Sequence, residues 1–138
     1  MYKKFNVIAV FDQSRQNMLM CKRRKHPYIG KKNLVGGKVE AGESSLAAAY
    51  RELFEETSVG KKDITLVHLM DFTYRLDKIR LEVFAGRLLN GVTPAGSENE
   101  LEWVKADENF FDAAKFAGEG NIGHIVAHIM LAKDKILK

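Results

Sequence analysis

Residues 44–56 read Ser44-Ser45-Leu46-Ala47-Ala48-Ala49-Tyr50-Arg51-Glu52-Leu53-Phe54-Glu55-Glu56. Alanine, leucine, arginine and glutamate are strong helix formers and serine is a favoured N-cap residue, so a helix is predicted to begin after Ser44 or Ser45. Apolar residues at positions 46, 49, 50 and 53 recur at helical spacing and would face a core. We expect an amphipathic helix here.

Three carboxylates, Glu52, Glu55 and Glu56, share one side of this predicted helix. At 3.6 residues per turn they fall within about 100° of the helix circumference. Like charges this close repel one another, and a hard divalent cation would offset the repulsion. Carboxylate oxygens without a nearby cysteine or histidine favour Mg²⁺ or Mn²⁺ over Zn²⁺. The alternative is a solvated acidic face, the usual explanation for this spacing.

The residues around these carboxylates favour the metal site. Arg51 stands one turn before Glu55, where it can pair with that carboxylate and fix its orientation. Directly before the helix, residues 36–43 combine three glycines with two further carboxylates. Glycine lets the backbone approach an ion or a phosphate without interference from a Cβ atom. The combination therefore indicates a site for a cation and a phosphate.

The rest of the chain predicts a single α+β domain over residues 1–138, since this length suits one domain and hardly two. Runs rich in β-branched and aromatic residues predict strands at residues 5–11, 18–21, 64–74, 79–89 and 101–104, the first two forming a hairpin. Residues 122–132 carry an apolar stripe that predicts a terminal helix packed on the sheet. This mixed order indicates a sandwich in which helices flank a mixed sheet.

Composition limits the class of protein. Apolar residues make up 46% and charged residues 29% of the chain, which excludes a disordered or low-complexity protein. The net charge of +4 could favour an anionic ligand without identifying one. The lone Cys21 cannot form an intramolecular disulfide, and the longest apolar runs fall far short of the ~18–20 residues that span a bilayer. We expect a soluble, cytoplasmic protein with no membrane partner, whose oligomeric state the sequence does not indicate.

A longer pattern joins the glycine-rich loop to the acidic helix. It runs from Gly37 through Glu43 to Arg51-Glu52-Leu53-Phe54-Glu55-Glu56-Thr57-Ser58-Val59. This pattern resembles the Nudix box, G-x5-E-x7-R-E-U-x-E-E-x-G-U with U a bulky aliphatic residue, at every fixed position except Ser58, where the family has glycine. That glycine shapes the helix exit, so Ser58 affects the turn but removes no proposed ligand. The element order is also similar to the Nudix fold, an α/β/α sandwich with a mixed sheet.

The resemblance implies a metal-dependent hydrolase. Such enzymes cleave a nucleoside diphosphate linked to another group, by attack of water on a phosphorus of the phosphoanhydride chain. The implied cofactor is Mg²⁺, with Mn²⁺ as the alternative. The implied ligands are Glu52, Glu55, Glu56 and the backbone carbonyl of Gly36.

The catalytic group implied by the resemblance comprises Arg51, Glu52 and Glu55, together with a general base. The base would be a box glutamate or a carboxylate from the loop ahead of Trp103, where relatives often have a glutamate in the metal site. Glu98 and Glu100 are both candidates, because the sequence gives no unique alignment through this loop. The box residue Glu43 could support the loop or hold a further ion.

The basic residues 22–26 precede the predicted metal loop. They could hold substrate phosphates or merely solubilise a surface turn. Position favours phosphate, since MutT-like relatives contact phosphate through an arginine at the end of this strand, where Arg23 and Arg24 match. A nucleic-acid surface is not expected from so short a tract with only Tyr28 as an aromatic neighbour.

Three further residues are candidates for substrate binding. Asn33 and Lys38 belong to Asn33-Leu34-Val35-Gly36-Gly37-Lys38, which resembles the N-x-x-G-G-K of enzymes that hydrolyse oxidised purine nucleoside triphosphates. An amide can read a purine edge with a donor and an acceptor, although Asn33 could also serve only as a turn residue. Asn121 lies where MutT-like relatives have a base-reading asparagine, but it could instead cap the terminal helix.

The function expected from the sequence is conversion of a nucleoside triphosphate, with 8-oxo-dGTP as one candidate, to the monophosphate and pyrophosphate. Two alternatives stay open. One is an enzyme that cleaves a dinucleotide or a nucleotide sugar with the same acidic helix. The other is a nucleotide- or RNA-binding domain without catalysis, which a lost carboxylate in the helix would favour, and here none is lost.

Overall fold

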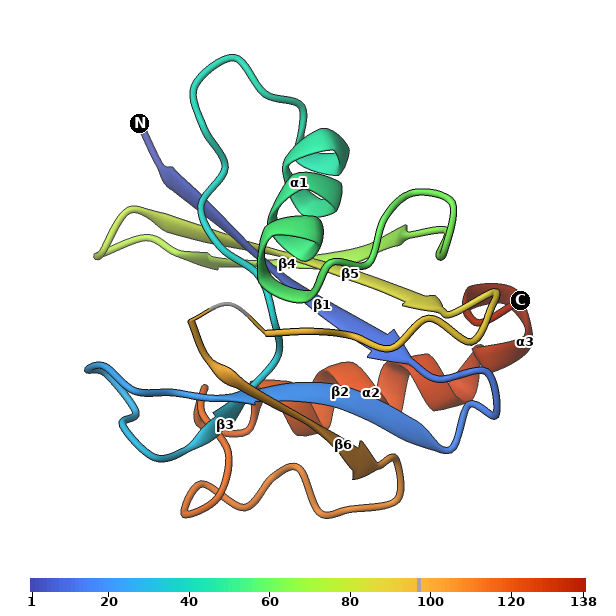
Figure 1. The fold of residues 1–138 in the computed structure, drawn as a ribbon. Helices are drawn as coiled ribbons and strands as arrows, with labels where there is room; N and C mark the ends of the chain where they lie inside the picture. The colour runs from blue at the N-terminus through green and yellow to red at the C-terminus, as the bar shows by residue number, and fades with distance from the viewer. Residues whose placement is uncertain (97) are drawn as a thin grey trace.

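The computed structural model describes residues 1–96 and 98–138. They form one mixed sheet with a helix on each face and a short helix at the C-terminal end (Figure 1). The strands are β1 (Lys3–Phe11), β2 (Asn17–Lys22), β3 (Lys32–Asn33), β4 (Val67–Tyr74), β5 (Ile79–Arg87) and β6 (Glu100–Lys105). The helices are α1 (Ser45–Thr57), α2 (Asn121–Leu131) and α3 (Lys133–Ile136). The predicted α/β/α sandwich with a mixed sheet is confirmed.

The sheet has the strand order β3-β2-β1-β5-β4, and β6 pairs with β2. Strands β1 and β5 run parallel and stay in register along their whole length, from Lys3 opposite Ile79 to Phe11 opposite Arg87. The other strand pairs are antiparallel. Because β1 and β5 are far apart in sequence, this central pairing depends on long-range contacts, which a local sequence pattern does not predict.

The predicted hairpin of residues 5–11 and 18–21 forms only at its turn. Strands β1 and β2 pair at Phe11 and Met18 and then diverge. Residues 32–38 enter the gap: β3 pairs with β2, and further on Ile8 N donates to Val35 O at 2.8 Å. The glycine-rich loop is therefore bonded to the edge of β1 and is placed beside α1.

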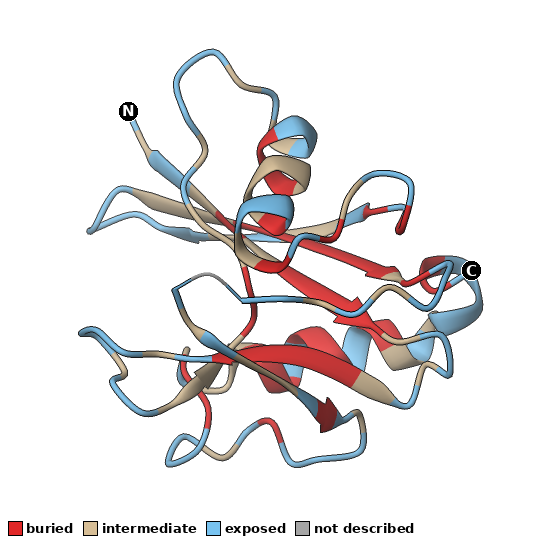
Figure 2. Cartoon of the chain, in the orientation of Figure 1, coloured by how far each residue is buried: buried red, intermediate tan, exposed pale blue. Residues whose placement is uncertain are grey.

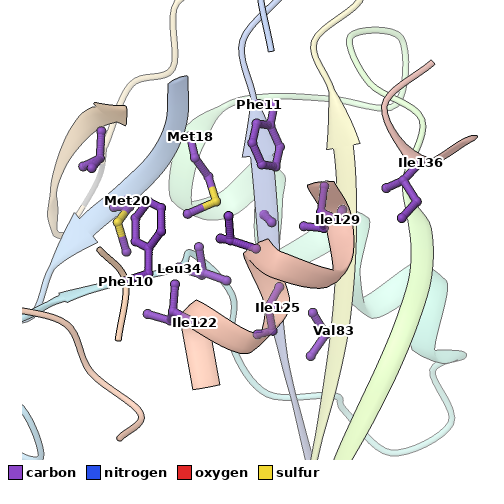
Figure 3. Close-up of a cluster of buried hydrophobic side chains, with 14 of the residues drawn as sticks. Phe11, Met18, Met20, Leu34, Val83, Phe110, Ile122, Ile125, Ile129 and Ile136 are labelled. Carbon is purple, nitrogen blue, oxygen red and sulfur yellow. The ribbon is translucent and has the colours of Figure 1, made fainter. Parts of the chain in front are cut away.

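Successive residues of β1 face opposite helices, because side chains alternate along a strand. Ile8 and Val10 pack in the cluster on the α1 side, whereas Ala9 and Phe11 pack in the cluster on the α2 side. Figure 3 shows Phe11 among the side chains of the α2 cluster. A strand covered on both faces reads as a continuous apolar run, and Figure 2 shows the central strands buried.

Helix α1 begins and ends as the sequence predicts. The Ser44 hydroxyl accepts from Ala47 N at 3.1 Å, which makes Ser44 the N-cap. At the exit Ser58 has φ 64°, the left-handed conformation that glycine adopts most easily, and its N–H donates to Phe54 O at 2.8 Å. The turn associated with the family's glycine is thus formed with serine.

The remaining predicted strands and the terminal helix are also present, with ends shifted by a few residues. Strand β4 begins at Val67 and is irregular between His68 and Met70, where its register against β5 shifts. Helix α2 buries Ile122, Ile125 and Ile129. In the described part of the chain, no helix has the length and apolar character needed to cross a membrane.

Candidate functional site

The three carboxylates of α1 line one cleft of about 210 Å³. Its other lining residues are Glu98 and Asn99, at the end of the loop between β5 and β6, and Leu101, at the start of β6. Leu101 reaches the cleft because β6 is held against β2, with Leu101 opposite Cys21. The long loop between β5 and β6 thus returns to face the acidic side of α1.

Two glycines allow the loop to pack between β1 and α1. Gly36 has φ 151°, and a Cβ atom there would overlap the backbone of Asn6. A Cβ atom on Gly37 would overlap the carboxylate of Glu52. The backbone of Gly36 lowers the pKa of the Glu56 carboxyl, so the loop's backbone lies beside the acidic cleft. The loop needs glycine at both positions for this close approach.

Arg51 is the centre of an ion-pair network. Its Nε and Nη2 bind both oxygens of Glu43 at 2.6 and 2.9 Å, and Nη2 also donates to the Lys38 carbonyl at 2.9 Å. Nη1 donates to Glu52 at 3.0 Å and to Glu55 at 3.2 Å. The bidentate hydrogen bond from Arg51 lowers the pKa of Glu43 to about 2. The expected pair with Glu55 is present, and Glu43 proves to be the stronger partner.

Glu56 has a different electrostatic setting. Burial raises the pKa of its carboxyl to about 7; the charges of Glu52 and Glu98 act in the same direction, whereas the Gly36 N–H and Arg23 lower it. Negative charge therefore accumulates here without full compensation. An oxygen-lined acidic cleft is the donor set that a hard divalent cation prefers, so the residues fit the metal that the sequence predicts.

The spacing of these carboxylates is wider than that of ligands around one ion. Within the described residues, His68, Asp71 and Glu82 are the group whose potential ligand atoms all lie within 4.8 Å of one another, and the α1 glutamates form no such group. Arg51 pairs with two of the three. A cation in the cleft would require these side chains to turn toward it.

The structure distinguishes the two carboxylates expected near Trp103. Glu98 lines the acidic cleft, and its charge acts on Glu56. Glu100 begins β6, is exposed and lies opposite Lys22 in the β2 register, outside the lining of the cleft. Of the two candidates, Glu98 is therefore the one placed with the α1 glutamates.

The basic loop adjoins the acidic cleft. Arg23, Arg24 and Lys25 line a second cleft of about 370 Å³, which shares Glu98 and Asn99 with the first. Arg23 is also tied to its own loop, since its Nε donates to the Pro27 carbonyl at 2.7 Å. Cationic side chains thus follow directly on the carboxylates, an arrangement suited to a polyphosphate chain.

Lys38 is placed differently from these arginines. Its side chain is exposed and is not among the lining residues of either cleft. Its carbonyl accepts from Arg51, so the backbone of Lys38 takes part in the network.

Asn33 and Asn121 line the same pocket, of about 470 Å³, with Tyr28 and Tyr74. The Asn33 side-chain oxygen accepts from Leu34 N at 2.8 Å. Asn121 Nδ2 donates to the Tyr74 hydroxyl at 2.6 Å. The interpretation of Asn121 as a helix cap is wrong, because the N-cap of α2 is Gly120, which has no side-chain capping bond. Asn121 is the first residue of the helix and turns toward β4.

Asn6 supports the glycine-rich loop and was not among the residues predicted from the sequence. Asn6 is 2% exposed, and its side-chain oxygen accepts from Gly37 N at 3.0 Å. Its backbone N–H donates to Gly37 O at 2.8 Å, so this residue contacts the loop twice. The available signal was an amide side chain within the apolar run of β1.

The NUDIX domain pattern matches residues 3–125. A structure from a study of MutT from Aliivibrio salmonicida and Vibrio cholerae is 24% identical, covering 93% of this chain and 99% of that one, with a TM-score of 0.74. A structure of a C. elegans Ap4A hydrolase binary complex is 19% identical, covering 95% of this chain and 98% of that one, with a TM-score of 0.73.

The E. coli dihydroneopterin triphosphate pyrophosphohydrolase is 22% identical, covering 93% of this chain and 99% of that chain, with a TM-score of 0.69. At these identities the three structures show a shared fold. The NUDIX domain match spans most of the 138 residues, including the glycine-rich loop and all of α1. The chain therefore belongs to the NUDIX domain family.

Proposed function

We propose that this protein is a divalent-metal-dependent pyrophosphohydrolase that converts a nucleoside triphosphate to the monophosphate and pyrophosphate. The observation that carries the proposal is the continuity of the two clefts: Glu98 and Asn99 line both the acidic one and the basic one. A cation and the phosphates that it neutralises would then lie side by side. Membership of the NUDIX domain family supports hydrolysis of a phosphoanhydride.

The residues of the acidic cleft have separate roles in this proposal. Glu52, Glu55, Glu56 and the carbonyl of Gly36 would hold Mg²⁺ or Mn²⁺. A cation there would neutralise phosphate charge and make the attacking water more acidic. Glu98 would accept the proton of that water, since it lines the same cleft as the α1 glutamates and comes from another segment of the chain. Arg51 acts as a positioning residue, because its five hydrogen-bond donors hold the carboxylates around it.

The base of the nucleotide would occupy the pocket lined by Asn33 and Asn121. Its volume of about 470 Å³ is within the range of pockets that bind small molecules. Tyr28 and Tyr74 offer rings for stacking, and two amides offer both donors and acceptors to a purine edge. We include a purine nucleotide in the proposal for this reason.

A cytoplasmic setting is also part of the proposal. The single cysteine of the chain, Cys21, is free and buried, which suits a compartment where thiols stay reduced.

The test of the proposed reaction is a product assay. Purified protein is incubated with nucleoside triphosphates, dinucleoside polyphosphates and nucleotide sugars, with Mg²⁺ or with a chelator, and products are resolved by chromatography. We expect Mg²⁺-dependent release of pyrophosphate from a triphosphate. Faster turnover of a dinucleotide or a nucleotide sugar would show that this compound class, and not a nucleoside triphosphate, is the substrate. Absence of turnover of all three classes would indicate a binding domain.

A pair of matched variants locates the reaction. Glu56→Gln should lower kcat by about 10²–10⁴-fold, because it removes the charge of a proposed metal ligand. Glu40→Gln makes the same chemical change at an exposed residue outside the cleft and should leave kcat unchanged. Equal activity of the two variants would exclude Glu56 from the metal site.

The base pocket is tested with Asn33→Ala. The variant should raise KM for purine triphosphates while leaving KM for pyrimidine triphosphates unchanged, since only a purine edge is proposed to meet the Asn33 amide. An equal increase for both classes would show that Asn33 does not read the base.

A further inference from the structure

A second group of side chains that could bind an ion lies on strands β4 and β5. His68, Asp71 and Glu82 each offer one ligand atom, and these atoms all lie within 4.8 Å of one another. Residues three apart on a regular strand face opposite sides of a sheet. Here the register shift between His68 and Met70 inserts an extra residue, so His68 lies opposite Phe84 and Asp71 lies opposite Glu82. The irregularity places all three side chains on the α1 side.

Glu82 is the buried member of this group. It is 3% exposed, and its Oε2 accepts from the Ser45 hydroxyl, in the first turn of α1, at 2.8 Å. This bond and the N-terminal end of α1 account for one carboxylate oxygen. The other oxygen, Oε1, is buried and has no hydrogen-bond partner among residues 1–96 and 98–138. A buried carboxylate oxygen without a partner is unfavourable, so a missing partner is expected there.

The neighbouring protein groups do not supply that partner. Asn6 lies opposite Glu82 in the β1–β5 register, yet its Nδ2 also lacks a hydrogen bond. Arg80, two residues earlier on β5, lies over the Tyr2 ring at 6.0 Å, and its buried Nε likewise has no hydrogen-bond partner. It forms no ion pair with a described residue. No described protein group is bonded to Oε1 in this arrangement, and an ion or a buried water could occupy that position.

His68 and Asp71 are already oriented beside Glu82. The His68 ring stacks on Phe84 with centroids 4.5 Å apart, and its Nε2 lies 2.7 Å from Asp71 Oδ1. The side chains of His68 and Asp71 are 40% and 37% exposed, which gives an ion a path from solvent. If both atoms bound one metal ion in place of this hydrogen bond, His68 Nε2 and Asp71 Oδ1 would have to move apart to about 3.3 Å. Two ligands at about 2.0 Å from a tetrahedral ion have this spacing.

We propose that His68, Asp71 and Glu82 form a second cation site, specific for a borderline divalent metal such as Zn²⁺. One imidazole nitrogen and two carboxylate oxygens suit Zn²⁺, whereas Mg²⁺ prefers oxygen donors alone. The two carboxylates balance the ion's charge, and Glu82 Oε1 gains its partner. This site is separate from the acidic cleft, because none of its three residues is among the described residues that line that cleft, and Glu82 is hydrogen-bonded to α1 at Ser45, in the first turn.

The experiment is a calorimetric titration of Zn²⁺ into the full chain in the presence of saturating Mg²⁺, which occupies the sites that oxygen donors alone provide. We expect one bound Zn²⁺ per chain. His68→Phe keeps a ring on Phe84 and removes the nitrogen ligand, so it should weaken Zn²⁺ binding by roughly 100-fold or more. Asp71→Asn removes a second ligand from an exposed position and should weaken binding as well.

The matched control is His128→Gln, because His124 and His128 stand one helical turn apart on the exposed side of α2 and could chelate Zn²⁺ themselves. This variant should bind Zn²⁺ as the original chain does, and Zn²⁺ should shift the His68 ring resonances in NMR spectra. Loss of binding in His128→Gln, full binding in His68→Phe, or a water at Glu82 Oε1 in a Zn²⁺-soaked crystal would each overturn the proposal.

Discussion

The two faces of the sheet bury different kinds of side chain. On the α2 face the buried cluster is apolar throughout, with side chains from β1, β2 and α2 closely packed (Figure 3). On the α1 face an apolar cluster is accompanied by buried polar residues. Among the described residues the buried polar or charged side chains are Asn6, Thr57, Asp63 and Glu82, which lie on the α1 face, on α1 itself or in the loop after it.

This difference separates stability from function. The α2 face removes apolar surface from water, and none of the buried polar side chains of residues 1–96 and 98–138 lies on it. The α1 face holds charges that repel one another, so some stability is given up to keep the acidic cleft ready for a ligand. Substitutions on the two faces should therefore act on different properties.

The largest expected effect on stability is at Ile129, which is 0% exposed in the α2 cluster. Ile129→Ala removes apolar contacts and leaves a cavity, which should lower the free energy of unfolding by about 2–5 kcal/mol. Urea denaturation followed by circular dichroism measures this change. Turnover per folded molecule should stay the same, since Ile129 lines neither cleft.

The control for this change is Leu131→Ala on the same helix. Leu131 is 88% exposed, so its truncation should change the free energy of unfolding by no more than about 0.5 kcal/mol. If Ile129→Ala reduced kcat in proportion to stability loss even at temperatures where the variant is folded, the division between the two faces would break down.

The next largest effect is an increase in the free energy of unfolding, and it concerns Glu56 on the α1 face. The pKa of Glu56 is raised from its ordinary 4.5 to about 7, so the folded protein holds this proton more tightly than the unfolded chain does. The stability that this group contributes is present below pH 4.5 and is lost as the pH rises through 7. Glu56→Gln carries no such charge. At pH 8 and without metal it should be more stable than the original chain by about 1–3 kcal/mol.

Urea denaturation at pH 4.5 and pH 8 tests this prediction, and the difference should nearly vanish at the lower pH. Excess Mg²⁺ should reverse the order, because the ion would bind and stabilise only the chain that has the carboxylate. A variant that is less stable at pH 8 would contradict the idea that the acidic cleft lowers stability.

The sequence predicted well those features that depend on local pattern. The N-cap at Ser44, the bounds of α1 and the strand β1 all follow from neighbouring residues. The three glutamates were expected to share one cleft for the same reason, since the helix places them on one side.

Long-range contacts explain what the sequence did not determine. Residues 32–38 enter between β1 and β2 because of hydrogen bonds to strands distant in the chain. The choice between Glu98 and Glu100 depends on where β6 begins against β2, and Asn121 turns to Tyr74 instead of capping α2. Likewise, only the paired strands reveal the irregularity that places His68 beside Asp71.

The smallest effect concerns Glu43, the carboxylate of the α1 side that stabilises the fold. Its bidentate bond with Arg51 lowers its pKa from 4.5 to about 2. The stability from this group is therefore present above pH 4.5 and is lost as the pH falls through 2. Glu43→Gln removes that dependence, so its melting temperature should fall less steeply between pH 5 and pH 3 than that of the original chain, with a modest change because the pair is partly exposed. Equal slopes would mean that Arg51 holds Glu43 no more strongly in the folded state than in the unfolded one. The opposite pH dependence of Glu43 and Glu56 would then be lost, and with it the view that Arg51 compensates only part of the charge beside the cleft.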